Sequence, residues 1–169
     1  RFATLIAVLG VINIIYGAVL ALVQNDLKRL VAYASISHMG IVLLGIASFT
    51  VAGIQGAIFQ LVSHGFITAL LFFMVGALAE RTNTRNISEL GGLSKSVPVL
   101  AGFTLAAVMA AIGLPGLSGF VSELLTLIGV FGAPADILPA AAVFGVLAGL
   151  GIILTAVYLL WAVKRTTFG

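Results

Sequence analysis

The chain has 169 residues, of which 62% are hydrophobic and only 8% are charged, with a formal net charge of +3. Soluble domains carry about 25% charged residues, so this composition indicates an integral, multi-pass membrane protein embedded in the lipid bilayer. The chain has no cysteine, which excludes disulfides, thiolate metal sites and cysteine-ligated iron–sulfur clusters, and the small positive charge indicates membrane orientation rather than a nucleic-acid partner.

Three long apolar segments open the chain. A helix needs about 20 apolar residues to cross the hydrocarbon of a bilayer. We predict spanning helices over about 2–23, 30–50 and 51–79, separated by the polar "QNDLKR" and by a tight turn. The one long polar segment follows, "ERTNTRNISELGGLSKSVP", and we predict that its Ser88 and Glu89 lie on a short interfacial helix.

The next apolar stretch is interrupted by "GLPGLSG". The pieces 98–113 and 119–131 are each too short to cross alone, so we predict one discontinuous span over about 98–131, broken at 113–119. Backbone groups freed at a break must be buried in protein or face a wet cavity. A last helix is predicted over about 137–163, which makes residues 1–169 a single all-α transmembrane bundle of five helices. The break is defined by Gly113, Pro115, Gly116 and Gly119.

The basic residues support five crossings. They stand in the first polar link, in the long polar segment and after the last helix, and five crossings place these three groups on one side of the membrane: Lys28, Arg29, Arg81, Arg85, Lys95, Lys164 and Arg165. Asp136 and Arg1 fall on the other side. The positive-inside rule makes the basic side cytoplasmic. Because the chain opens with Arg1 instead of Met, we expect a fragment of a longer protein.

Three ionisable side chains are predicted near mid-membrane, namely His38, His64 and Glu123. Intramembrane ionisable groups usually face a relay or an ion path, and histidine exchanges protons near neutral pH. We therefore predict a proton relay with no catalytic residue in the enzymatic sense and no metal site. Polar neighbours on the same helices are predicted to support it: Tyr33, Ser37, Gln60, Ser63 and Ser122.

Other interpretations stay open at this point. Each histidine, taken alone, could be a hydrogen-bonded packing residue, and Glu123 could be the structural partner of a lysine on a neighbouring helix. The segment "GLPGLSG" lacks the spacings of a Rossmann or phosphate-binding loop. No cysteine or carboxylate stands at ligand spacing from either histidine, which argues against a metal site.

Three longer motifs resemble a known family: "LVQNDLKRLVAYASISHMGIVLLGI", "QLVSHGFITALLFFMVGALAERTNTRNISELGGL" and "GLPGLSGFVSELL". They are similar to the antiporter-like membrane subunits of respiratory complex I, the NADH:quinone oxidoreductase, and most similar to the M-type subunit. This resemblance implies a fourteen-helix subunit built from two inverted five-helix repeats, of which this chain would be the second, about helices nine to thirteen. By the same resemblance His38 and His64 match histidines of the central polar axis, and Glu123 matches the carboxylate of the broken helix.

The resemblance implies a proton-translocating subunit that contains no redox centre. NADH, FMN, iron–sulfur clusters and quinone would be bound by partner subunits, and L- and N-type antiporter-like subunits would be its neighbours. The expected location is a bacterial inner membrane, with the thylakoid or mitochondrial inner membrane as alternatives. An Mrp-type cation/proton antiporter, a membrane-bound hydrogenase subunit and a purely structural helix bundle remain alternative functions.

Overall fold

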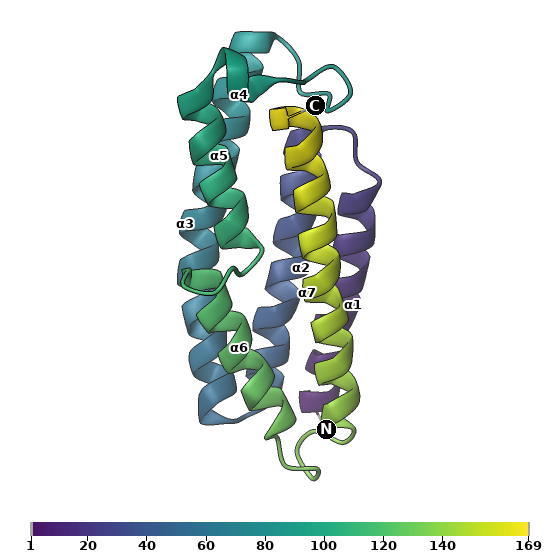
Figure 1. Ribbon diagram of the computed structural model, residues 1–169. Helices are drawn as coiled ribbons and strands as arrows, with labels where there is room; N and C mark the ends of the chain where they lie inside the picture. The colour runs from purple at the N-terminus through teal and green to yellow at the C-terminus, as the bar shows by residue number, and fades with distance from the viewer. Residues whose placement is uncertain (1, 169) are drawn as a thin grey trace.

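The computed structural model describes residues 2–168, and within that range every regular element is a helix (Figure 1). The all-α membrane class with one discontinuous helix is thereby confirmed. The elements in chain order are α1 Phe2–Leu22, α2 Leu27–Ala47, α3 Val51–Thr82, α4 Leu93–Ser96, α5 Pro98–Ala111, α6 Ser118–Phe131, α7 Ala141–Val163 and a π-helical turn over Lys164–Phe168.

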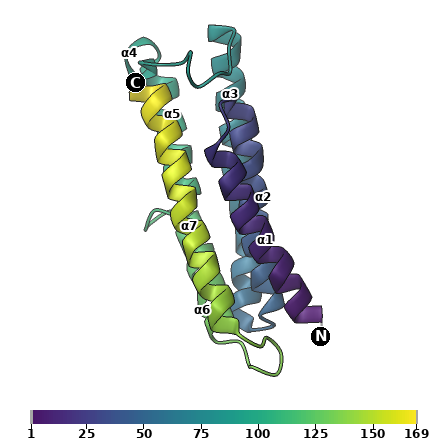
Figure 2. The ribbon, with the colours of Figure 1, turned by 90° about the vertical axis from the view of Figure 1, so that its right-hand side faces the viewer.

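Five crossings of the bundle result from these elements. By length and composition α1, α2, α3 and α7 with its π-helical extension can each cross a membrane, whereas α5 and α6 are too short to do so alone. The two short helices stack end to end along α3, which contacts both of them, so together they make one crossing (Figure 1). α1 packs against α2 and α7, and Figure 2 shows this side of the bundle.

Small residues bring α1 and α2 into close contact. A Cβ added to Gly17 would lie 2.7 Å from the Ser37 amide nitrogen, so only glycine permits this separation of the two backbones. The Ser37 hydroxyl donates to the carbonyl of Ile14 across the same interface, at 2.9 Å. Tight backbone approach with interhelical hydrogen bonds is typical of helix association in membranes, where no hydrophobic force drives helices together.

Two helix starts differ from the sequence expectation. α2 begins at Leu27 rather than Leu30, because the Asp26 carboxylate caps it by accepting from the amides of Lys28 at 2.7 Å and Arg29 at 3.1 Å. α7 begins at Ala141 rather than Ile137, because Pro139 disfavours the helical conformation at the preceding Leu138 and Ala140 takes a positive φ of 60°.

The polar segment after α3 also differs from expectation. α3 continues to Thr82 and ends at Asn83, which adopts the left-handed conformation with φ 56°. Ser88 and Glu89 lie in a turn rather than on a helix, because the Glu89 carboxylate accepts from the Thr84 hydroxyl at 2.5 Å and from the Asn86 amide at 3.2 Å. The short helix of this segment is α4 instead.

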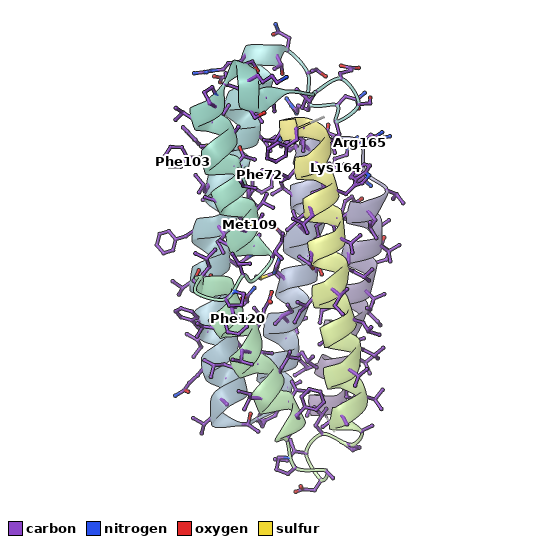
Figure 3. The ribbon with its side chains drawn as sticks, in the orientation of Figure 1. Phe72, Phe103, Met109, Phe120, Lys164 and Arg165 are labelled. Atoms are coloured by element: carbon purple, nitrogen blue, oxygen red, sulfur yellow. The ribbon has the colours of Figure 1, made fainter. Side chains whose placement is uncertain are left out.

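The basic segments gather at one end of the bundle. The first polar link and the loop after α3 are joined by backbone hydrogen bonds, from the Leu27 amide to the Arg85 carbonyl at 3.1 Å and from the Ile87 amide to the Asn25 carbonyl at 2.7 Å. Figure 3 shows Lys164 and Arg165 at this same end. The five-crossing arrangement therefore places all three basic groups together, as the charge distribution predicts.

Candidate functional site

The break between α5 and α6 lies about midway along the bundle (Figure 1). Gly113 and Gly116 adopt positive φ values of 76° and 99°, which glycine tolerates far better than other residues. The connecting segment projects from the side of the bundle, where Leu114 and Leu117 are exposed (Figure 2). A Cβ on Gly119 would collide with the Ala110 carbonyl, so this glycine lets α6 start directly beside the end of α5.

Glu123 links the break to α2. It stands in the second turn of α6 and is only 4% exposed. One carboxylate oxygen, Oε2, faces the break so closely that a Cβ on Gly113 would lie 2.5 Å from it. The other oxygen, Oε1, lies 3.9 Å from Nδ1 of His38. The side chain therefore stands between the interrupted backbone and the histidine.

The two histidines contact each other directly. Their ring centroids are 5.1 Å apart, with planes tilted by 35°. His38 is buried on α2, while His64 on α3 is half-buried and has the Thr68 hydroxyl 3.0 Å from its Nε2. A cavity of about 10 Å³ adjoins both rings, and this is about the space that one water molecule needs.

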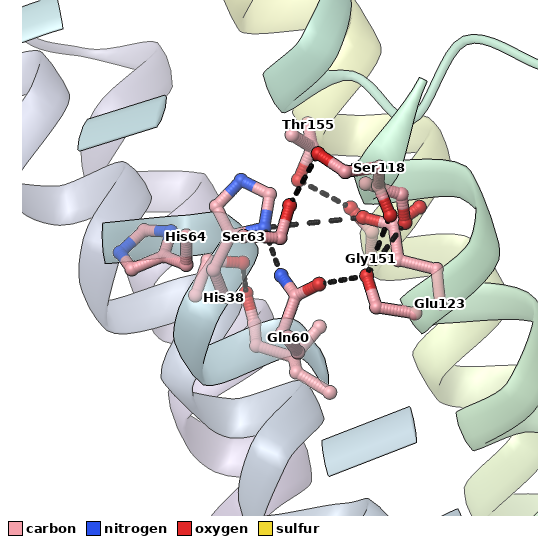
Figure 4. A network of polar contacts seen from close by, with 12 residues as sticks. His38, Gln60, Ser63, His64, Ser118, Glu123, Gly151 and Thr155 are labelled. Atoms are coloured by element: carbon pink, nitrogen blue, oxygen red, sulfur yellow. Dashed lines mark hydrogen bonds and ion pairs between the residues drawn. The ribbon is translucent and has the colours of Figure 1, made fainter. Parts of the chain in front are cut away.

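Gln60 of α3 connects His38 to α6. Its amide nitrogen lies 3.3 Å from Nδ1 of His38, and its amide oxygen accepts a short hydrogen bond from the Ser122 hydroxyl (Figure 4). One turn further along α3, the Ser63 hydroxyl donates to the Ser118 hydroxyl at 2.7 Å. Three helices thus meet in one buried polar cluster, held by hydrogen bonds on either side of the contact between His38 and Glu123.

Two of the predicted supporting residues lie outside this cluster. Ser37 faces α1, where its hydroxyl donates a hydrogen bond to the Ile14 carbonyl. Tyr33 packs against a hydrophobic core to which α1, α2, α3, α5 and α7 contribute. Gln60, another predicted supporting residue, lies within the cluster, where its amide contacts His38 of the neighbouring helix.

Sequence reasoning missed the polar residues of α7 and one of α6. Thr155 lies beside the cluster, donating to the Gly151 carbonyl at 3.1 Å (Figure 4). Tyr158 and Thr126 are fully buried, and their hydroxyls find no hydrogen-bond partner among residues 2–168. The detectable signal was the helical spacing of Gly151, Thr155 and Tyr158, which places small and polar residues on one face of an apolar helix.

The chemistry available to this arrangement is proton exchange. Within residues 2–168 no three His, Cys, Asp or Glu side chains are placed to hold a metal ion. His64, His38 and Glu123 form a continuous series of titratable groups from the half-buried side of α3 to the helix break. Ionisable side chains beside a discontinuous helix are a combination that recurs at ion- and proton-binding sites of membrane proteins.

Comparisons with known proteins identify the family. The chain belongs to the family described as "NADH:quinone oxidoreductase/Mrp antiporter, TM", whose model matches residues 1–159. It is 48% identical over 168 residues to "NAD(P)H-quinone oxidoreductase chain 4 1" of Synechococcus sp. (strain JA-2-3B'a(2-13)), covering 99% of this chain and 32% of the relative. It is 46% identical over 169 residues to "NAD(P)H-quinone oxidoreductase chain 4" of Prochlorococcus marinus (strain NATL1A), covering 100% of this chain and 31% of the relative.

Solved structures share the same fold. A chain of "Respiratory complex I from Thermus thermophilus with bound NADH" superposes with a TM-score of 0.91 at 39% identity, covering 99% of this chain and 34% of that chain. A chain of the Mrp complex from Dietzia sp. DQ12-45-1b superposes with a TM-score of 0.89 at 28% identity, covering 99% of this chain and 30% of that chain. The resemblance to antiporter-like subunits is confirmed, and the chain spans about a third of the length of these relatives.

Proposed function

We propose that this chain is part of a proton-translocating membrane subunit of an NADH:quinone oxidoreductase. The observation that carries the proposal is the buried contact series from His64 through His38 to Glu123, which ends against Gly113 of the broken helix. Each member can bind and release a proton. The two histidine ring centroids are 5.1 Å apart, and Nδ1 of His38 lies 3.9 Å from Oε1 of Glu123. The series runs across the helices, so it would move protons in the plane of the membrane.

The helix break supplies the other half of the proposed path. Backbone amides and carbonyls freed between α5 and α6 cannot be left in hydrocarbon, and they favour water or a polar partner at mid-membrane. Glu123 faces this segment with one oxygen and His38 with the other. We infer that Glu123 exchanges its proton with an aqueous face through the break and with the interior through His38.

The redox cofactors and the quinone site of the proposed complex would lie in partner subunits. We propose that NADH, FMN, iron–sulfur clusters and quinone are bound by partner subunits and that L- and N-type antiporter-like subunits lie beside this one. The relatives named as a chain of NAD(P)H-quinone oxidoreductase and as respiratory complex I support such a multisubunit complex. Their organisms favour a bacterial cell membrane or a thylakoid as the location.

An Mrp-type cation/proton antiporter is the second candidate, because the family and one solved structure include Mrp proteins. Among the solved structures, the identity is 39% to the complex I chain and 28% to the Mrp chain, which favours the first candidate. Purification of the native assembly separates the two, because redox subunits would copurify only in the first case.

Replacement of Glu123 by glutamine tests the proposal. Glutamine keeps the shape and the hydrogen bonding but carries no titratable proton, so the complete complex should assemble normally while proton pumping falls strongly. Glu123→Asp should retain part of the pumping, and Glu80→Gln, an exposed position on α3, serves as the matched control. Pumping is measured in reconstituted vesicles during NADH:quinone turnover.

The alternative role of Glu123 gives a different result. If the carboxylate were a permanent structural partner of a buried cation, Glu123→Gln would leave that cation unpaired at a cost of about 3–5 kcal/mol and would chiefly reduce assembly. Full pumping by an assembled Gln variant would remove Glu123 from the relay.

A further inference from the structure

Gln60 occupies the position from which the step between His38 and Glu123 can be controlled. The side chain is 2% exposed, and its amide nitrogen lies 3.3 Å from Nδ1 of His38. The same ring nitrogen faces Oε1 of Glu123 at 3.9 Å, while the other ring nitrogen, Nε2, has no hydrogen-bond partner among residues 2–168. The amide of Gln60 and the carboxylate of Glu123 therefore compete for one atom of His38.

The orientation of the amide follows from its second contact. In the structure the amide oxygen accepts from the Ser122 hydroxyl, and the amide nitrogen points at His38. An NH2 group only donates, so Nδ1 must accept and therefore carries no proton. In this arrangement His38 is a neutral imidazole with its proton on Nε2, and its Nδ1 is occupied by Gln60 rather than by Glu123.

A second arrangement of the same side chains is available without moving the backbone. The Ser122 hydroxyl has another acceptor within reach, the Gly119 carbonyl at 2.8 Å. If that hydroxyl turns to Gly119, its oxygen can accept from the Gln60 NH2 group, and the rotated amide presents its oxygen to Nδ1. All these hydrogen bonds are then satisfied with a proton on Nδ1.

We infer that Gln60 is an amide switch that gates proton transfer between Glu123 and His38, and this inference rests on the proposed function. In the closed arrangement the NH2 group blocks Nδ1. When the amide rotates, the Glu123 carboxyl group can pass its proton to Nδ1, which leaves a carboxylate and an imidazolium with Nδ1–H donated to the Gln60 oxygen. Transfer in the opposite direction passes through the same rotated arrangement: Nδ1–H returns its proton to the Glu123 carboxylate, which restores the carboxyl group and the neutral imidazole. Ser122 turns its hydroxyl between Gln60 and Gly119 as the amide rotates.

The substitution Gln60→Met tests the switch, because methionine is similar in length and volume but offers no amide donor. In the complete complex, removal of the block should let protons cross without turnover. We expect an imposed pH gradient across reconstituted vesicles to decay several-fold faster than with the unmodified complex, and the number of protons pumped per electron to fall while quinone reduction continues. Gln55→Met, the same change at an exposed site on α3, is the matched control.

Two results with Gln60→Met would overturn the inference. If Gln60 only supports the path, Gln60→Met should slow quinone reduction and pumping together without a leak, and this would overturn the inference, as would an unchanged gradient decay. Two further variants separate the inference from the proposed function. Adding Glu123→Gln to Gln60→Met should abolish the leak, whereas full pumping by Glu123→Gln alone would refute the relay itself.

Discussion

His38 is the residue on which the contacts of the site converge. Its ring lies against His64 on one side, and its Nδ1 atom faces both Gln60 and Glu123. These partners come from two other helices, since His64 and Gln60 stand on α3 and Glu123 stands on α6. Histidine suits this place because one ring nitrogen can accept while the other donates, so a proton can enter and leave by different atoms.

His64 gives the residue-scale test of the relay. Its ring contacts His38 and its other neighbour is the Thr68 hydroxyl, so it is the end of the series that lies nearest to the surface of this bundle. We expect His64→Leu to lower pumping by about an order of magnitude or more, because a proton donor and acceptor is lost while the volume is nearly kept. The measurement is the proton-to-electron ratio in vesicles.

Phe66→Leu, at an exposed position on the same helix, should leave the ratio unchanged. An unaltered ratio in an assembled His64→Leu complex would reduce His64 to a packing residue.

The sequence could predict the titratable residues but not their partners. His38, His64 and Glu123 stand out because ionisable side chains are rare in apolar helices. The pairing of Gln60 with His38 depends on how α2 and α3 are rotated about their axes, which helical spacing within one chain segment does not fix. Tyr158 escaped notice for the same reason, since one hydroxyl in an apolar helix gains meaning only when the facing helix is known.

At the scale of elements, the broken helix has two glycines with different tasks. Gly113 and Gly116 both adopt positive φ, so both require the conformational freedom of glycine. Only Gly113 lies against the Glu123 carboxylate, whereas a Cβ on Gly116 would meet no atom within 4 Å. The pair therefore allows backbone strain to be separated from displacement of the carboxylate.

We expect Gly113→Ala and Gly116→Ala to have unequal effects. Each adds a Cβ to a left-handed residue, which costs about 1–2 kcal/mol of stability. Gly113→Ala must in addition push the Glu123 side chain away from the break, so it alone should reduce pumping strongly. Thermal stability of the assembled complex and pumping in vesicles are measured for both variants. Equal pumping in the two would show that the position of Glu123 beside Gly113 is unimportant.

The helices were largely predictable from the sequence, because a bilayer fixes the length of a spanning segment and requires its backbone groups to be hydrogen-bonded within a helix. The discontinuous helix formed by α5 and α6 was predicted from two features, the short length of its apolar pieces and the Gly- and Pro-rich segment "GLPGLSG" between them. The start of α2 was missed because a carboxylate was interpreted as part of a polar link, although Asp26 is a strong helix cap. The helix expected around Glu89 failed because local hydrogen bonds from Thr84 and Asn86 favour a turn.

At the scale of the whole molecule, the bundle has one basic end and one nearly uncharged end. The basic end includes the loop that contains Arg85, and the opposite end contains the exposed Asp136. Such an asymmetry determines orientation during insertion, because basic loops remain in the cytoplasm.

The orientation can be tested with single cysteines, because the chain has none of its own. In the complete subunit, with any cysteine outside this chain replaced, Arg85→Cys should react with a membrane-impermeant maleimide only from the cytoplasmic side. Asp136→Cys should react only from the opposite side. Labelling of both positions from the same side would contradict the five-crossing arrangement, and the reverse pattern would contradict the orientation.

The break between α5 and α6 also has an electrostatic consequence. The two helices run in the same direction, so the carbonyl end of α5, with a partial charge of about −0.5, meets the amide end of α6, with about +0.5. Glu123 reaches back to this junction through Oε2. An ionised carboxylate is attracted to the amide end of α6 and repelled by the carbonyls of α5, whereas a protonated one can donate its hydrogen to those carbonyls. The charge state of Glu123 is therefore coupled to the two helix ends: the amide end of α6 favours the carboxylate, and the carbonyl end of α5 favours the protonated carboxyl group.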